Sequence, residues 1–349
     1  MASGNTWRQQ RRFTLSQFRN FGIGKSSFQD QISQEVSFLL KELRKHSGKV
    51  VDPSKMLFNT VSNIICSVIF GQRFEYTDEK FLQIVLLLRK QFELAGSGGL
   101  AVFIPILHYF HSSSKQQLTD DVRALTTFIH TIVQCHRKIF DSDNMSDYID
   151  VYLNELDKLN HVKNGNKISP SLSEHNLCRT ITQLFAAGTE TTATTLSWGI
   201  LYMMAYPDVQ SRVQQEIDHV VGRNRMPRIS DKLPYTEATL MEIQRCASIV
   251  PLGVPHIATR HSTLGGYEIP EGTMLLANIW AVHHDPDIWK NPHEFTPERF
   301  FDENGNLAQP KEYIPFSVGK ELKNKGWGIN QDHKKRGMSV TWVFLKWTP

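Results

Sequence analysis

The sequence has few cysteines: four in 349 residues, and no two of them form a C-x-x-C pair. A disulfide framework or a structural zinc site needs paired cysteines at short spacing. The wide spacing therefore argues against both and favours a reducing compartment. The four residues are Cys66, Cys135, Cys178 and Cys246.

Long apolar runs are also missing. No stretch reaches the roughly 18 apolar residues that a membrane span needs. The nearest candidate, residues 100–107, is short and contains Pro105. We interpret it as core, with peripheral contact to a membrane surface as the alternative. Met1 leads directly into a polar, basic segment, which is not the pattern of a signal peptide.

The body of the chain has no excess charge. Lys and Arg number 39 against 35 Asp and Glu, a net charge of +4. Residues 321–349 contain six basic and two acidic side chains, which accounts for the whole excess. No basic surface for nucleic acid is therefore predicted. The same residues hold three of the seven tryptophans and show no clear period, so we expect one domain over residues 1–320 and an unrelated basic tail over 321–349.

Apolar periodicity and the placement of Pro and Gly predict a mainly α fold with a small β portion. A polar stretch over residues 155–170 is expected to be a surface loop. The expected helices cover residues 1–50 with a break at Gly22 and Gly24, then 53–70, 79–94, 118–140, 171–206, 209–222 and 234–246. The expected strands are 257–260, 267–269 and 274–279.

The longest expected helix runs from Ser171, which with Glu174 matches a capping box, to the residue before Pro207. Its middle places Gly188 beside Glu190 and a run of hydroxyls. Gly costs about 1 kcal/mol in a helix interior relative to Ala, and a buried Glu costs more unless it is paired. One interpretation is a segment that handles protons or a small ligand. The other is a core helix whose threonines bond back to the carbonyl four residues earlier.

Glu242 and Arg245 are three residues apart on an expected helix, so they face the same side and can pair. Arg299, in the segment Pro297–Phe300, could complete a buried Glu–Arg–Arg network. A surface salt bridge is the alternative for an isolated pair.

The order of the motifs is more specific than any one of them. They are Trp7-x-x-x-Arg11, Ala187–Thr191, Glu242-x-x-Arg245, Pro255–His256, Pro297–Phe300 and Phe316–Gly319. This succession, over about residues 3 to 320, closely resembles the cytochrome P-450 haem-thiolate monooxygenases. Residues 70–78 and 266–273 look like the microsomal, family 2-like group. The resemblance implies a cytochrome P-450 fold that is incomplete, without the N-terminal anchor and first helices and without the C-terminal haem loop and last helix.

The resemblance also implies roles for individual residues, with haem as the cofactor. Gly188 would leave room for dioxygen, and Glu190 and Thr191 would relay protons. The haem propionates would be bound by Trp7, Arg11 and His256, although His256 alone could be an ordinary strand residue. A structural network on the proximal side would consist of Glu242, Arg245 and Arg299. An apolar substrate pocket, or otherwise simply core, would be formed by Phe185, Ala186, Val250, Leu252 and Val254.

The implied activity is hydroxylation or epoxidation of an apolar small molecule (a fatty acid, steroid or xenobiotic) with dioxygen and electrons from NADPH–cytochrome P-450 reductase. The implied location is the cytosolic face of the endoplasmic reticulum membrane. Because this chain lacks the anchor, we expect it to be cytosolic or peripheral.

The sequence departs from the family pattern after Gly319. Glu321 occupies the expected Arg position, and Lys323 occupies the position of the haem-ligand Cys. An ammonium group is cationic at neutral pH and cannot supply the electron density of a thiolate. We therefore expect no metal ligand there, no haem binding of the normal kind and an inactive chain. The alternatives are activity through another ligand, a truncated isoform that competes for the parent enzyme's partners, or a gene-model artefact. Histidines that could replace the thiolate, each interpreted as a surface residue, are His283, His284 and His333.

Overall fold

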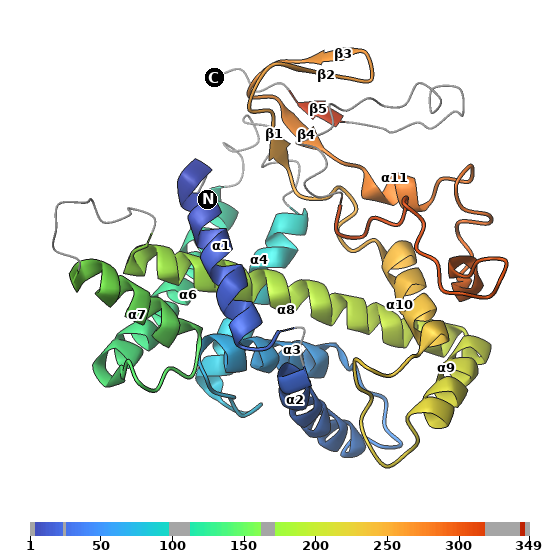
Figure 1. Cartoon of the computed structure of the whole chain (residues 1–349), viewed down its shortest axis with the longest axis horizontal. Helices are drawn as coiled ribbons and strands as arrows, with labels where there is room; N and C mark the ends of the chain where they lie inside the picture. Colours follow the sequence, from blue (N-terminus) through green and yellow to red (C-terminus); the bar gives the residue numbers. More distant parts are fainter. Residues whose placement is uncertain (1–3, 24–25, 98–111, 162–171, 318–342, 346–349) are drawn as a thin grey trace. The chain divides into compact units, whose positions relative to one another are not determined.

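The computed structural model describes residues 4–23, 26–97, 112–161, 172–317 and 343–345. The chain is mainly helical with a small β portion, as predicted (Figure 1). It divides into two compact units, residues 1–197 and 198–349, and each is described by itself. The helices of the first unit are α1 (Gly4–Asn20), α2 (Ser26–Arg44), α3 (Ser54–Ile69), α4 (Glu79–Ser97), α6 (Ser112–Ile139), α7 (Tyr148–His161) and most of α8 (Glu174–Ala205).

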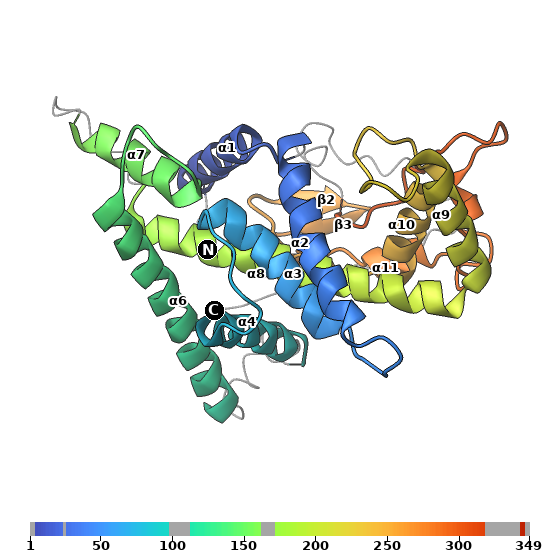
Figure 2. The same ribbon diagram turned by 90° about the horizontal axis from the view of Figure 1, so that it is seen from below.

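The first unit is built around one apolar core, to which α3, α4, α6, α7 and α8 all contribute. Figure 2 shows α2 beside α3 and α4 beside α6. Within each of these pairs, the two helices pack against each other. Each fully buried Leu or Ile stabilises the fold by about 1.5–3 kcal/mol. Fully buried members include Leu88, Leu125, Val133, Leu153 and Ile181.

Two buried tyrosines of α7 hold α1 in place. The Tyr148 hydroxyl lies 2.8 Å from Thr14 Oγ1, and Gln10 Nε2 donates to the Tyr152 hydroxyl at 2.7 Å. The ring of Phe13 meets Tyr152 edge to face, with centroids 5.3 Å apart. These hydrogen bonds satisfy polar side chains that are buried between α1 and α7. Together with the ring contact, they fix both the position and the rotation of α1.

The long helix α8 starts slightly later than predicted. Its first residue is Glu174, and the Ser173 hydroxyl accepts the Asn176 amide at 3.2 Å. The cap is therefore Ser173, whereas the predicted partner Ser171 lies outside the described residues. The Glu174 carboxylate instead bonds Gln134 Nε2 of α6 at 3.2 Å. At the far end α8 stops at Ala205, before Pro207, which confirms the predicted stop.

The predicted loop over residues 155–170 is wrong for its first part, because residues 155–161 continue α7. The buried residues Ile149, Tyr152, Leu153 and Leu156 have helical spacing and form the core-facing stripe. Polar side chains on the opposite face dominate the composition of this segment, and composition alone suggested a loop.

The second unit contains the end of α8, then α9 (Pro207–Val220), α10 (Pro234–Ala247), α11 (Ile279–His283) and a 3₁₀ turn η2 (Pro297–Phe300). α10 begins at Pro234, as predicted, whereas α9 begins at Pro207, two residues before its expected start. α9 ends before Gly222, whose φ of 76° suits a glycine C-cap. The predicted strand 274–279 is wrong in its last three residues, because the strand ends at Leu276 and Ile279 begins α11. Asn278 caps that helix by accepting the Ala281 amide at 3.0 Å.

Two small sheets complete the second unit. β2 (Ser262–Leu264) and β3 (Tyr267–Ile269) form a hairpin whose turn residues, Gly265 and Gly266, both have positive φ. β1 (His256–Ile257), β4 (Met274–Leu276) and β5 (Val343–Leu345) form an antiparallel sheet in the order β1-β4-β5. One strand of the residues expected to be a tail therefore pairs with β4.

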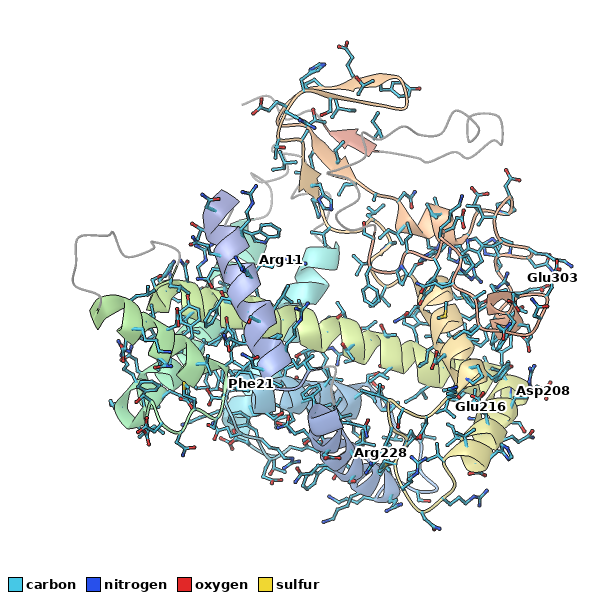
Figure 3. The ribbon with its side chains drawn as sticks, in the orientation of Figure 1. Arg11, Phe21, Asp208, Glu216, Arg228 and Glu303 are labelled. Atoms are coloured by element: carbon cyan, nitrogen blue, oxygen red, sulfur yellow. The ribbon has the colours of Figure 1, made fainter. Side chains whose placement is uncertain are left out.

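A carboxylate from α9 caps α10. Glu216, labelled in Figure 3, accepts the Tyr235 amide at 2.9 Å and the Thr236 amide at 2.7 Å. Leu233, which precedes α10, has no side-chain acceptor to offer. Glu216 therefore satisfies free donors at the start of the helix that carries Glu242 and Arg245.

Candidate functional site

The middle of α8 is a regular helix in which Gly188 has a packing role. A Cβ atom at Gly188 would lie 3.0 Å from Ile65 Cδ1 of α3, so glycine permits the close approach of these two helices. Thr191 Oγ1 donates to the Ala187 carbonyl at 2.7 Å, and Thr194 Oγ1 donates to Glu190 Oε1 at 3.3 Å. The back-bonding predicted as the structural alternative is thus present. The proton relay through Glu190 and Thr191 stays a prediction.

On α1, Trp7 and Arg11 lie one turn apart. The Arg11 guanidinium carbon is 5.6 Å from the centre of the Trp7 ring. Trp7 is 44% exposed and Arg11, labelled in Figure 3, is exposed. Both side chains are exposed, and both carry N–H donors that a carboxylate can accept. His256, at the start of β1, is also exposed and belongs to the other unit.

Glu242, Arg245 and Arg299 form a buried hydrogen-bonded network. Arg245 Nε lies 2.7 Å from Glu242 Oε2 and its Nη2 lies 2.9 Å from Oε1. Arg299 Nε donates to Glu242 Oε1 at 3.0 Å, and the Thr296 amide donates to the same oxygen at 2.9 Å. Glu242 and Arg245 are both 0% exposed.

The carboxylate of Glu242 is shared by two guanidinium groups, those of Arg245 and Arg299. Burial by itself lowers the pKa of Arg245, but the hydrogen bond and charge of Glu242 outweigh burial, so the pKa lies above its ordinary value. A further Arg245 donor, Nη1, bonds the His283 carbonyl at 2.6 Å. Arg299 Nη1 bonds the Lys290 carbonyl at 2.8 Å. The network therefore ties α10 to α11 and to the loop after it.

His283 corrects one prediction: it is not a surface histidine but 0% exposed. Its Nε2 accepts the Ile314 amide at 3.0 Å, and its Nδ1 lies 2.9 Å from Ser248 Oγ. Burial, followed by the nearby charge of Arg245, lowers the pKa of His283 to about 4. No local pattern marks this residue, because both side-chain partners are more than 30 positions away in the sequence.

The other two histidines considered as ligands are less informative. His284 is partly exposed and stacks on Trp280, with ring centroids 4.5 Å apart. His333 lies outside the described residues.

The residues predicted to line a substrate pocket have different environments. Phe185 is 2% exposed, belongs to the core of the first unit and contacts Phe70 at a centroid distance of 6.2 Å. Ala186 packs against the same core. In the second unit Val250 is partly buried, whereas Leu252 and Val254 are 42% and 63% exposed. A substrate pocket formed by these residues stays a prediction.

A polar cavity of about 260 Å³ lies elsewhere in the first unit. Its lining includes Glu35 of α2, Asn63 of α3 and Arg73. None of the predicted site residues lines it.

Three of the four cysteines are held as thiols. Burial raises the pKa of Cys66 and of Cys178. Burial, with the charge of Glu242, raises the pKa of Cys246 to about 12. Cys135 is exposed on α6. Position 323 lies outside the described residues. A raised pKa keeps these three groups protonated, so they do not fit the thiolate that a haem iron takes in this class. Trp7 and Arg11 offer donors of the kind that a haem carboxylate accepts.

A comparison with known protein families finds a match that covers most of the chain, including all the motifs described above. The cytochrome P-450 family model matches residues 1–321. The chain therefore belongs to the cytochrome P-450 family, for which haem is the cofactor.

Three relatives narrow the class. Human cytochrome P-450 2U1 is 41% identical over 91% of this chain and 59% of that protein. Human cytochrome P-450 2J2 is 41% identical over 92% and 63%, and rabbit cytochrome P-450 2B4 is 40% identical over 92% and 65%. The expected family 2-like, microsomal character is confirmed. The chain spans about three fifths of the length of these relatives. Within its described part, no helix has both the length and the hydrophobicity to cross a bilayer.

Proposed function

We propose that this chain carries the scaffold of a haem monooxygenase acting on apolar organic substrates, and that the chain itself is catalytically inactive. The residue that carries the second statement is Lys323, which stands where the family places its haem-ligand Cys. A lysine ammonium offers three donors and no acceptor. It therefore cannot act as a thiolate, and Glu321 adds a negative charge where an arginine is expected.

The proposed roles follow the matched motifs. Gly188, Glu190 and Thr191 belong to oxygen activation. Trp7, Arg11 and His256 bind the haem carboxylates. The exposure of the Trp7 and Arg11 side chains supports the role of these two residues. Glu242, Arg245 and Arg299 act structurally, which their complete mutual pairing supports.

The proposed partner is NADPH–cytochrome P-450 reductase, and the proposed location is the cytosolic face of the endoplasmic reticulum, where microsomal relatives reside. We further propose a domain over residues 1–320 followed by a basic tail.

A second candidate is a non-catalytic product that competes with a full-length relative for its partners. The supporting observation is that Glu242 is paired with Arg245 and Arg299 of this chain, which gives the second unit a folded core of its own. Co-expression with a full-length relative should then lower the activity of that relative. Unchanged activity at equal expression would remove this candidate.

The test of the main proposal is the carbon monoxide difference spectrum of the full chain after reconstitution with haem. The wild-type chain should lack the strongly red-shifted Soret band of thiolate ligation. Lys323→Cys combined with Glu321→Arg should gain it. Lys325→Cys combined with Glu321→Arg is the matched control, because it adds the same thiol two residues away. A red-shifted band in the wild-type chain would contradict the proposal.

A further inference from the structure

The segment Tyr313–Ser317 contains the start of the matched motif Phe316–Gly319. Hydrogen bonds attach it to α10 and to α11. The Tyr313 hydroxyl donates to Gln244 Oε1 of α10, and the Tyr313 ring packs edge to face on Phe300 at 5.3 Å. The Ile314 amide donates to the imidazole of His283 at 3.0 Å. Phe316 is 84% exposed. The backbone of this segment is thus anchored to a side chain at Ile314.

We propose that His283 is a positioning residue: its neutral imidazole connects the end of α10 to the Ile314 backbone and so fixes the approach to the haem loop. This inference rests on the proposed function in one respect only, namely that Phe316 begins the haem-loop motif.

The hydrogen bonds allow one tautomer. A backbone amide can only donate, so His283 Nε2 must be unprotonated and Nδ1 must carry the proton. Nδ1–H therefore donates to Ser248 Oγ, and the Ser248 hydroxyl in turn donates to the Arg245 carbonyl at 2.9 Å. The three hydrogen bonds therefore all run in the same direction, from the Ile314 amide through His283 and Ser248 to the Arg245 carbonyl.

The backbone conformation of Ser248 supports a structural role for its hydrogen bonds. Ser248 caps α10 in the left-handed region with φ of 36°, which is uncommon for a residue other than Gly, Asn or Asp. Holding a serine there costs free energy, which the bonds to His283 and Arg245 offset. A glycine at this position would relax the backbone, but it would lack the hydroxyl that connects His283 Nδ1 to the Arg245 carbonyl.

The groups around His283 disfavour its protonated form. Arg245 donates to the His283 carbonyl and places a positive charge nearby, and His284 acts in the same sense. Tyr313 stacks on the imidazole at 6.1 Å, and burial raises its pKa, so it remains neutral. Glu242 is the one opposite charge in the surrounding network, and Arg245 and Arg299 already engage it. A proton added at Nε2 would also face the Ile314 N–H and break that bond.

The first test uses the wild-type chain and the imidazole ¹⁵N chemical shifts of His283. We expect the Nδ1–H tautomer at pH 7, with no titration down to pH 5. An Nε2–H tautomer, or titration near the ordinary pKa of about 6.5, would overturn the proposal. This readout needs no variant to fold and no haem.

The second test compares hydrogen exchange at the Ile314 amide in two variants. His283→Leu removes the acceptor, and exchange should become about tenfold faster because one anchoring bond is lost. His283→Gln places an amide oxygen near the Nε2 position and should restore most of the protection. His284→Leu is the matched control and should leave the Ile314 amide unchanged. Equal protection in His283→Leu and wild type would overturn the positioning role.

These outcomes are distinct from those of the proposed function. If the wild-type chain never takes up haem but Ile314 depends on His283 as described, the positioning role stands and only the link to haem is lost. If the chain takes up haem equally well with His283→Leu and His283→Gln, and Ile314 exchange does not change, the positioning role is wrong.

Discussion

Removing the negative charge of Glu242 should strongly destabilise the second unit. The perturbation is Glu242→Gln, which keeps the shape of the side chain and removes its charge. In the wild type, four bonds converge on the carboxylate, two from Arg245, one from Arg299 and one from the Thr296 amide. Gln offers one oxygen in place of two, and its NH₂ group would face an arginine donor.

The expected cost follows from burial. Arg245 is 0% exposed, so the substitution leaves a buried guanidinium without its counter-charge. Breaking one partner of a buried ion pair typically costs about 3–5 kcal/mol. Arg299 retains its carbonyl contacts and is partly exposed, so we expect it to contribute less.

The assay is denaturant unfolding of the full chain, with hydrogen exchange of α10 amides to assign the loss to the second unit. Glu237→Gln is the matched control, because Glu237 is exposed on the same helix and should change stability by less than about 0.5 kcal/mol. A cost below about 1 kcal/mol for Glu242→Gln would show that the network does not hold the unit together. The double variant with Arg245→Met should be less damaged than the single variant, since no unpaired buried charge remains.

Three further predictions concern other contacts. Gly188→Ala should change stability by less than about 1 kcal/mol, because the helix gain offsets a 3.0 Å contact with the end of Ile65; Gly188→Val should cost about 1–3 kcal/mol in denaturant unfolding. Glu216→Ala should cost about 1 kcal/mol by the same assay, since two amides at the start of α10 lose their acceptor, and an unchanged stability would contradict the capping role. For His136, burial lowers the pKa but the hydrogen bond to Asp147 at 2.8 Å outweighs it and raises the pKa above 6.5. Its stabilisation is therefore present below pH 6.5 and lost as the pH rises through the folded-state pKa; Asp147→Asn should abolish this pH dependence, and a persisting one would refute the assignment.

Local signals predicted the elements that local chemistry determines. Pro207 ends α8 and Pro234 starts α10 where expected, and the expected helix 53–70 ends just before Gly71, whose φ is 65°. Proline and glycine restrict or extend backbone angles at their own position, so no distant residue is needed to read them. The miss at α7 has the opposite origin, since its stripe of buried residues is stabilised by contacts with other helices.

The candidate site divides in the same way. The spacing of Glu242 and Arg245 places both on one face of a helix, so the pair itself was predictable. Its burial was only one of two alternatives, because burial depends on Trp289 and Phe300, which lie more than 40 positions later and pack against α10 or its arginine. His283 escaped prediction for the same reason, since its two partners are contributed by different segments.

The buried network also bears on how a chain with Lys323 can retain its fold. Every bond to Glu242 comes from a side chain or backbone amide of this chain, and none of them requires haem. A buried charge destabilises a protein when its partner is removed, but the partners of Glu242 are all intact here. The proposed loss of the haem-ligand sulfur at position 323 would therefore leave the partners of Glu242 in place. In the proposed assignment, the chemistry of the class depends on residue 323, whereas we expect the stability of the second unit to depend on Glu242, so the first could be lost while the second is kept.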